Sequence, residues 1–459
     1  MRPYTPRQLF EVLQPLFPVN RYWIAFSGGL DSMVLLHSMA SLRADLPGVA
    51  LQAVHIDHGL HPESPDWSRW CVAQAGAVAV PCEVVAVEVN REKGTSLEAQ
   101  ARDARYAAFA TRVKPGDCLL TAHHADDQAE TLLLQLLRGA GVHGLAAMPF
   151  TAPFAGGVIV RPLLELTRAQ LAGYAADHGL PWLDDPTNEN TGFDRNYLRH
   201  NVMPVLRDRW PAVAATVSRS AGHCADAAQL LDEVAAQDMQ HVADADGALC
   251  IERLRDLPGE RQRHLLRHWL RTLQLPVPRQ TRTEQILIQM LGADVDRYPL
   301  VAWPGAEVRR YRDRLYAMPP LTAHDARRQL RWDIAVPLEL PWLAQRVVAV
   351  TDVGNGLSAR QCEAAPVTIR FRQGGEMCQP SGSRHRKALK KLFQEYGLPA
   401  WERDRVPLIY LDDQLAAVGG YWICEPFQAA PDEPAVRPEV QNIHLRNSGR
   451  SGTFLSRPV

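Results

Sequence analysis

Hydrophobic and polar positions alternate regularly through the first half of the 459-residue chain. Short apolar runs, typical of buried strands, are separated by longer stretches whose apolar residues recur at helical spacing. The predicted strands are Tyr22–Phe26, Gly48–Ile56, Cys82–Val89, Asp117–Ala122 and Val158–Leu164. The predicted helices are Pro6–Leu16, Pro65–Ala75, Leu97–Val113, a helix that begins at Asp126 or Asp127 and reaches Arg138, and Thr167–His178. Strands that alternate with helices indicate an α/β fold with a doubly wound, mostly parallel sheet.

The alternation stops after this first region. A long alanine-rich linker helix is predicted at Pro211–Met239, followed by two helices and a hairpin at Glu260–Leu273, Thr281–Leu291 and Glu307–Ala317. Later strands and a basic helix are predicted at Val367–Phe371, Arg386–Tyr396, Pro407–Leu411 and Leu415–Cys424. We therefore expect an N-terminal domain (1–212), a small helical middle domain with its linker helix (213–325), a small α+β domain (326–432) and a disordered polar tail (433–459).

Bulk composition indicates a cytoplasmic globular protein. No apolar run is long enough to span a membrane, and the N-terminus lacks the basic and apolar segments of a signal peptide. The eight cysteines contain no Cys-x-x-Cys pair, which argues against a disulfide framework, a zinc ribbon or an iron–sulfur site. The net charge of −1 does not by itself suggest a nucleic-acid partner.

A phosphate site is predicted where the first strand breaks, in the sequence Ser27-Gly28-Gly29-Leu30-Asp31-Ser32. A glycine turn between a strand and a helix start presents backbone amides to an anion, and the helix dipole favours negative charge. The segment matches neither the Walker A pattern nor the dinucleotide fingerprint. An ordinary tight turn with an Asp or Ser helix cap remains the alternative for the glycine pair alone.

Polar side chains gather after two other predicted strands. His55, Asp57 and His58 end the second strand, and the sequence from His123 to Glu130 follows the fourth. Parallel sheets bind ligands at the carboxyl ends of their strands. Asp127 and Glu130 are three residues apart on one helical turn and should face the same way. A site for a metal ion is less favoured, because these histidines lack a zinc-protease spacing.

Basic residues form three groups. Arg102 and Arg105 are one turn apart, and Arg195 and Arg199 follow a polar, turn-rich stretch. For both groups an exposed helix face and a phosphate contact are equally good explanations. The third group, Ser381–Lys391, holds five cations and no acid, which in a nearly neutral chain favours a nucleic-acid contact.

Together these residues resemble a known family. The Ser27–Ser32 loop looks like the pyrophosphate loop (PP-loop) of the N-type ATP pyrophosphatases, which have a Rossmann-like fold. Further motifs resemble one branch, the tRNA(Ile)-lysidine synthetases: His55-Ile56-Asp57-His58-Gly59-Leu60, Ala101-Arg102-x-x-Arg105-Tyr106, His123-His124-x-Asp126-Asp127-Gln128-x-Glu130-Thr131, Arg161-Pro162-Leu163-Leu164, Asp185-Pro186-Thr187-Asn188, Asp194-Arg195-Asn196-x-Leu198-Arg199, Arg370-Phe371-Arg372-x-Gly374-Gly375-Glu376 and Lys390-Lys391-Leu392-Phe393. The resemblance covers roughly Tyr22 to Cys424 and is weakest in the middle domain.

The resemblance implies a two-step ligase reaction. ATP adenylates the oxygen at carbon 2 of the wobble cytidine in tRNA(Ile) with a CAU anticodon, and free L-lysine then displaces AMP to give lysidine. Mg2+ would bridge the phosphates of ATP, and Asp31 is a candidate side-chain ligand. The implied ATP-binding residues are Ser27, Gly28, Gly29, Leu30, Asp31, Ser32, His55 and Asp57.

The same resemblance suggests roles for other residues. Asp31, Arg105, Asp127 and Glu130 are the predicted catalytic residues. Lysine or the target cytidine would contact His123, Asp127 and Glu130. The tRNA would contact Arg195, Arg199, Arg384, Arg386, Lys387, Lys390 and Lys391. The sequence does not give the oligomeric state, so a homodimer is an open alternative to a monomer.

Other activities of the superfamily fit less well. A PP-loop tRNA thiolase generally uses paired cysteines, which this chain lacks. Amidotransferase synthetases need an ammonia source, yet Arg2 stands where a glutaminase domain would place its cysteine. An RNA-binding protein with an inactive nucleotide loop is disfavoured by the intact Ser27–Ser32 segment.

Overall fold

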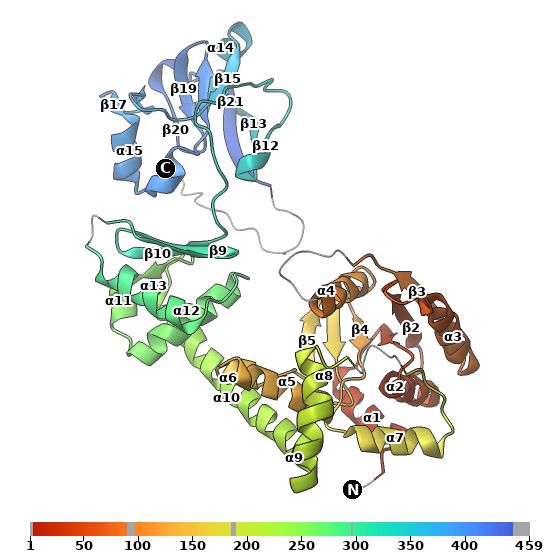
Figure 1. Cartoon of the computed structure of the whole chain (residues 1–459). Coiled ribbons are helices and arrows are strands. Elements are labelled where there is room, and N and C mark those ends of the chain that lie inside the picture. Colours follow the sequence, from red (N-terminus) through yellow and green to blue (C-terminus); the bar gives the residue numbers. More distant parts are fainter. Residues whose placement is uncertain (1–2, 90–96, 185–189, 295–296, 444–459) are drawn as a thin grey trace. The chain divides into compact units, whose positions relative to one another are not determined.

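The structure of the protein is a computed structural model that describes residues 3–89, 97–184, 190–294 and 297–443. The chain divides into two compact units, Met1–Leu231 and Asp232–Val459 (Figure 1). Among the described residues, no helix is both long and apolar enough to cross a membrane.

A six-stranded sheet organises the first unit, in the order β3-β2-β1-β4-β6-β5. Its strands are β1 (Arg21–Ala25), β2 (Ala50–Asp57), β3 (Cys82–Ala86), β4 (Asp117–Leu120), β5 (Thr151–Phe154) and β6 (Gly157–Val160). All neighbouring strands are parallel except β5, which pairs antiparallel with β6 at the edge. The predicted doubly wound, mostly parallel sheet is therefore confirmed.

Helices cover both faces of this sheet (Figure 1). On one face lie α1 (Pro6–Leu13), α2 (Leu30–Ser41), α3 (Ser64–Ala77) and α7 (Arg168–Asp177), and on the other lies α4 (Leu97–Ala110). The helices α5 (Ala125–Leu137) and α6 (Val142–Leu145) pack against each other. The strand β1 shows why two layers form, since its side chains point alternately to opposite faces. Ile24 packs with residues of α1, α2, α3 and α7, whereas Trp23 packs with Phe109 of α4 and its neighbours.

The first unit continues through α8 (Asp194–Tyr197), one π-helical turn (Leu198–Val202) and α9 (Met203–Arg209). The predicted linker helix is α10 (Val213–Val242), and it begins after Pro211. Two features differ from the expectations for this unit. The short helix α6 and the edge strand β5 were not among the predicted elements.

The second unit begins with a mixed region. It contains β7 (Leu249–Cys250), α11 (Ile251–Arg255), α12 (Gly259–Thr272), α13 (Gln280–Gly292), β8 (Leu300–Trp303), β9 (Ala306–Tyr311) and β10 (Arg314–Met318). Both predicted helices and the predicted hairpin are present. In addition, β7 and β8 extend the hairpin to a four-stranded antiparallel sheet in the order β7-β10-β9-β8. Trp269 of α12 is fully buried in the core of this region.

The remainder of the second unit is built on short antiparallel strands. One sheet joins β11 (Leu330–Arg331), β15 (Val367–Arg370), β18 (Leu408–Leu411), β19 (Gln414–Val418) and β20 (Trp422–Ile423). A second sheet joins β12 (Leu338–Leu340), β13 (Gln345–Val353), β21 (Pro434–Asn442) and β14 (Leu357–Ser358) in that order. The smaller elements are β16 (Met377–Cys378), β17 (Lys387–Ala388), α14 (Ala359–Ala364), α15 (Leu389–Tyr396) and α16 (Ala400–Arg403).

The prediction of a disordered tail from residue 433 is wrong for Pro434–Asn442. This segment is strand β21, which pairs with β13 over nine consecutive residues, and Ala435 lies in the interior. The segment is polar, and its partner strand lies about ninety residues earlier in the sequence. Local sequence patterns therefore do not indicate this strand. The rest of the predicted tail, residues 444–459, lies outside the described residues, as do the family-like residues Asp185–Asn188.

Candidate active site

The predicted phosphate loop lies between the end of β1 and the start of α2. Gly28 has φ of +86°, which only glycine adopts without strain, and a Cβ there would lie 2.9 Å from Sγ of Cys71. The carbonyl of Gly28 also accepts a hydrogen bond from the amide of Leu183 at 2.9 Å. Packing on α3 and on the Leu183 segment therefore holds the loop in one conformation.

The two serines tie the ends of this loop together. Ser27 Oγ and Ser32 Oγ are 3.1 Å apart, and Ser32 Oγ donates to the carbonyl of Gly29 at 2.9 Å. Gly29 is the N-cap of α2, so the first free amides of a twelve-residue helix lie here. The side chain of Leu30 is buried in the core, which leaves only its backbone for a phosphate. This geometry suits an anion.

Asp31 lies in the first turn of α2, and only one of its two carboxylate oxygens has a partner among the described residues. Its Oδ2 lies 3.4 Å from Nε2 of His124, whereas its Oδ1 is buried and has no hydrogen-bond partner among the residues that the structure describes. Buried carboxylate oxygens normally find a donor or a cation. An oxygen of this kind fits a hard divalent ion such as Mg2+, which prefers oxygen ligands.

His124 was not among the predicted site residues, although it is central to the geometry. It is the N-cap of α5, 2% exposed, and its Nε2 lies 3.4 Å from both Asp31 Oδ2 and Asp127 Oδ2. Burial lowers the pKa of His124, but the carboxylates of Asp127, Asp31 and Asp126 outweigh burial and raise it above the ordinary value. In the charged form its Nδ1 faces Asp126 Oδ2 at 3.7 Å. His124 therefore links the phosphate loop to the start of α5.

Asp127 and Glu130 face the same way, as predicted, and both carboxylates form ion pairs with two arginines. Glu130, 1% exposed, accepts from Nε of Arg195 at 2.8 Å and from Nε and Nη2 of Arg199 at 2.8 and 2.9 Å. Asp127 Oδ1 accepts from Arg195 and Arg199 at 3.0 and 3.1 Å. Burial raises the pKa of Asp127, but His124 and both arginines more than reverse this effect, so its carboxyl stays ionised.

The π-helical turn after α8 belongs to this network. Arg195 lies in α8 and Arg199 in the π turn, yet both guanidinium groups reach the same two carboxylates. π turns often occur at functional sites because they redirect side chains within a helix. Two anions and two cations thus form one nearly neutral cluster beside the phosphate loop residues.

The neighbouring histidines are uncharged at neutral pH. His123 contacts Oγ1 of Thr121 at 2.9 Å, and burial lowers its pKa to about 3 against the pull of Asp127. His55 is buried and its Nδ1 lies 2.9 Å from the carbonyl of Phe26, immediately before the loop. Burial also lowers the pKa of His55. Both imidazoles therefore act as hydrogen-bonding groups and not as cations.

Asp57 and His58 form hydrogen bonds with different partners. Asp57 Oδ1 accepts from the amide of Gly59 at 2.9 Å, and its Oδ2 lies 3.4 Å from Oγ of Ser68, which ties β2 to α3. His58 Nε2 accepts from Nε of Arg105 at 3.3 Å, and burial with this guanidinium lowers the pKa of His58 to about 4. Arg105 is therefore positioned near the end of β2, on an exposed part of α4.

Comparison with known proteins gives a consistent picture over the length of the chain. Family models match for a PP-loop domain (1–206), a TilS substrate binding domain (249–316) and a TilS substrate C-terminal domain (367–440). A tRNA(Ile)-lysidine synthase from Coxiella burnetii is 44% identical over 95% of this chain and 97% of the relative. Another from Methylococcus capsulatus is 43% identical over 91% of this chain and 95% of the relative. The chain belongs to the tRNA(Ile)-lysidine synthase family.

Among solved structures, a U34-tRNA thiolase from Methanococcus maripaludis is similar at 16% identity, with a TM-score of 0.40, over 48% of this chain and 77% of that chain. The PP-loop match confirms the predicted resemblance and an ATP-binding fold for the first unit of this tRNA(Ile)-lysidine synthase family member.

The predicted tRNA contacts of this lysidine synthase family member lie in both units. Arg195 and Arg199 belong to the buried ionic cluster of the first unit, so neither presents a free guanidinium in this structure. The other five lie in the second unit, where Arg384, Arg386, Lys390 and Lys391 are exposed. The helix α15 begins at Leu389, so Arg384 and Arg386 precede it in a loop. Lys387 is paired with Glu395 at 2.9 Å.

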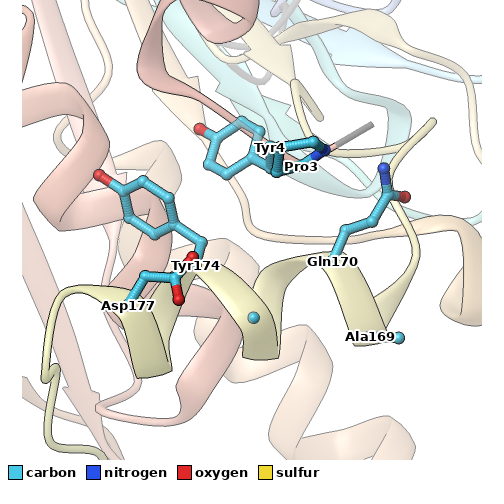
Figure 2. Close-up of a pocket in the computed structure, with 7 residues that line it drawn as sticks. Pro3, Tyr4, Ala169, Gln170, Tyr174 and Asp177 are labelled. Carbon is cyan, nitrogen blue, oxygen red and sulfur yellow. The ribbon is translucent and has the colours of Figure 1, made fainter. Parts of the chain in front are cut away.

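One hollow in the first unit lies away from these residues. It has a volume of about 300 Å³ and is lined by Pro3, Tyr4, Ala169, Gln170, Gly173, Tyr174 and Asp177, between the N-terminal segment and α7 (Figure 2). None of the predicted site residues lines it. We assign it no part in the chemistry of the lysidine synthase family.

Proposed function

We propose that the protein ligates free L-lysine to carbon 2 of the wobble cytidine in tRNA(Ile) with a CAU anticodon. The oxygen at carbon 2 attacks the α-phosphate of ATP, and pyrophosphate leaves. The lysine ε-amine then attacks carbon 2, AMP leaves, and lysidine results. Membership of the tRNA(Ile)-lysidine synthase family is the observation that carries this proposal.

The phosphate loop would hold the pyrophosphate portion of ATP. Its amides at the N-terminus of α2 and the hydroxyls of Ser27 and Ser32 are suitable donors for this anion. Asp31 would hold Mg2+ through its unpartnered Oδ1. The ion, when bound, neutralises the charge that develops on the leaving phosphates. Arg105, whose position is held by a hydrogen bond to His58, would stabilise the adenylated cytidine.

Asp127 would bind the lysine ammonium, with Glu130 as its buried support. Of the two carboxylates, the side chain of Asp127 is the more open, at 13% exposure against 2% for Glu130. An arriving ammonium would replace an arginine on Asp127, while Glu130 would keep its pairs with both arginines. The Nη2 of that arginine, released from Asp127, would then be available to a tRNA phosphate, which accounts for the predicted role of Arg195 and Arg199 in tRNA binding.

Incorporation of radiolabelled lysine into unmodified tRNA with a CAU anticodon tests the reaction. With ATP and Mg2+ present, we expect label in this tRNA and none in a tRNA with a different anticodon. Absence of label in both contradicts the proposal. Incorporation of labelled sulfur from a sulfur donor would instead support a thiolase.

The Asp127→Asn variant tests the assignment of the lysine site. Loss of the charge should reduce lysine transfer by roughly 100-fold or more, because a buried charge pair is worth about 2–5 kcal/mol. Release of pyrophosphate with ATP and tRNA, in the absence of lysine, should be far less affected. Asp194→Asn is the matched control, since Asp194 is exposed and lies 3.6 Å from Arg138. Equal loss of both steps in Asp127→Asn would contradict a specific contact with lysine.

A further inference from the structure

Two cysteines that are distant in the sequence meet inside the second unit. Sγ of Cys378 and Sγ of Cys424 are 2.8 Å apart, although 46 residues separate them. The side chains are 1% and 3% exposed, and both thiols are free. Two sulfur atoms at this distance are closer than a van der Waals contact and need little movement to form a bond.

The backbone holds these thiols together from both sides. The amide of Glu425 donates to the carbonyl of Gln379 at 2.8 Å, and the amide of Ser381 donates to the carbonyl of Ile423 at 2.9 Å. Pro380 also forms an antiparallel bridge with Cys424. The two cysteines therefore lie on paired segments, and their proximity does not depend on one side-chain rotamer.

The two thiols differ in their electrostatic surroundings. The hydrogen bond between the two thiols lowers the pKa of Cys424 against the effect of burial, and a backbone hydrogen bond from Gln379 lowers it further, while the charge of Arg386 acts on both thiols. The same sulfur–sulfur hydrogen bond and burial raise the pKa of Cys378. Cys424 is therefore the thiol that ionises first, and the thiolate is the reactive form of cysteine.

We propose that Cys378 and Cys424 form a peroxide-sensitive dithiol that closes to an intramolecular disulfide. The Cys424 thiolate attacks hydrogen peroxide, breaks its O–O bond and becomes a sulfenic acid, and the released hydroxide takes a proton to give water. The Cys378 sulfur then attacks the sulfenic sulfur. The S–O bond breaks, a second water leaves, and the S–S bond forms. Two thiols are oxidised and one peroxide is reduced to two waters.

The oxidant must be small, because both sulfur atoms are buried. Hydrogen peroxide is close to water in size, and β16 and β20 are two residues long, so local opening of these strands admits it. Larger oxidants such as glutathione disulfide require wider opening. The proposal therefore names peroxide as the class of oxidant.

The disulfide would tie one end of a basic loop, at Cys378, to the segment around Cys424. Cys378 pairs with Lys387 in the β16–β17 hairpin, and this hairpin encloses the exposed residues Arg384 and Arg386. Because the sulfur atoms already touch, oxidation retains the present shape of the loop and restricts its opening. This modification site does not depend on the proposed ligase activity, and its test needs no tRNA.

Peptide mapping of the full chain after mild peroxide treatment tests the proposal. We expect a cross-linked peptide pair containing Cys378 and Cys424, lost on treatment with a dithiol reductant, and slower hydrogen exchange in residues 379–387. Cys362→Ser is the matched control, since Cys362 is a buried thiol of the same unit, and this variant should still form the cross-link. Absence of the cross-linked peptide from the folded wild-type chain overturns the proposal.

Single variants test the order of the two steps without relying on stability. Cys378→Ser should accumulate a sulfenic acid at Cys424 that a 1,3-dicarbonyl probe traps. Cys424→Ser should give several-fold less adduct at Cys378, because Cys378 is buried and lacks the backbone hydrogen bond from Gln379 that favours the Cys424 thiolate. Equal trapping at both sites, or preferential trapping at Cys378, overturns the assignment of Cys424 as the attacking thiol.

Discussion

At the scale of single residues, the candidate active site of the first unit contains charged side chains that are largely buried. Glu130 is almost completely buried yet accepts three hydrogen bonds from Arg195 and Arg199. Burial of one charge without the others would cost several kcal/mol. The four side chains are therefore interdependent, and a change of charge at one of them affects the other three.

Gly28 gives a direct test of the phosphate loop. Gly28→Ala should lower the free energy of unfolding by about 1–2 kcal/mol from the left-handed backbone alone, with a further loss from contact with Cys71. ATP affinity should fall with it, because the loop must shift. Urea unfolding and equilibrium ATP binding measure the two effects. Gly29→Ala is the control for stability, since its φ is −71° and its nearest Cβ neighbour is at 3.6 Å.

His124 predicts a specific pH dependence of stability. Its folded pKa is raised by the surrounding carboxylates of Asp31, Asp126 and Asp127. Its contribution is therefore complete below the unfolded pKa of about 6.5 and is lost as the pH rises through the higher folded value. The stability advantage of the wild type over His124→Asn should shrink as the pH rises above about 6.5. Urea unfolding of both proteins across this range measures it, and a constant difference would contradict the prediction.

The sequence predicted which residue types gather at the sheet edge, but not their partners. The spacing of Asp127 and Glu130 indicated a shared face, and the structure agrees. That Arg195 and Arg199 occupy this face could not be predicted, because it depends on a π turn and on contacts across about seventy residues. His124 was part of the predicted cluster from His123 to Glu130, but no role was assigned to it, because a histidine N-cap is unusual.

At the scale of elements, local signals predicted helices better than edge strands. Thr167 and Gln170 form a capping box at the start of α7, and the predicted helix begins where the structure has it. The strands β5, β7 and β8 are two to four residues long, which is too short for a clear alternation. Such strands form because a neighbouring strand offers hydrogen bonds, and a single sequence does not record that neighbour.

The α7 cap can be tested by substitution. Thr167→Ala should lower the free energy of unfolding by about 1 kcal/mol, because the amide of Gln170 loses its side-chain acceptor. Thr167→Ser keeps a hydroxyl at this position and should change stability by only a few tenths of a kcal/mol. Urea unfolding of the three proteins measures both values. Equal losses in the two variants would indicate that packing of the Thr167 methyl group is the dominant effect.

At the scale of the whole molecule, charge is distributed unevenly in a chain with net charge −1. The segment from Arg384 to Lys391 is basic and mostly exposed, whereas the arginines of the first-unit cluster are neutralised by carboxylates. The exposed cations of this segment can therefore attract a polyanion, whereas Arg195 and Arg199 cannot do so while they are paired. Two lysines of the segment allow a quantitative test.

Replacing Lys390 and Lys391 together with alanine should weaken tRNA binding. The slope of log affinity against log salt should fall by about 1.4 to 1.8 in magnitude, since each phosphate contact contributes about 0.7 to 0.9. Binding measured at several salt concentrations checks this value. Lys114→Ala is the control, because Lys114 is an exposed lysine of the first unit. An unchanged slope in the double variant would mean that α15 does not contact the tRNA backbone.

The position of β21 has a consequence for synthesis of the protein. This strand lies between β13 and β14, so the sheet has two unpaired strand edges until Pro434–Asn442 has left the ribosome. Unpaired edges are templates for incorrect association. A nascent chain that pauses before residue 434 would therefore expose both edges at once. We expect this sheet to fold only after Pro434–Asn442 has been synthesised, and to be prone to aggregation before then.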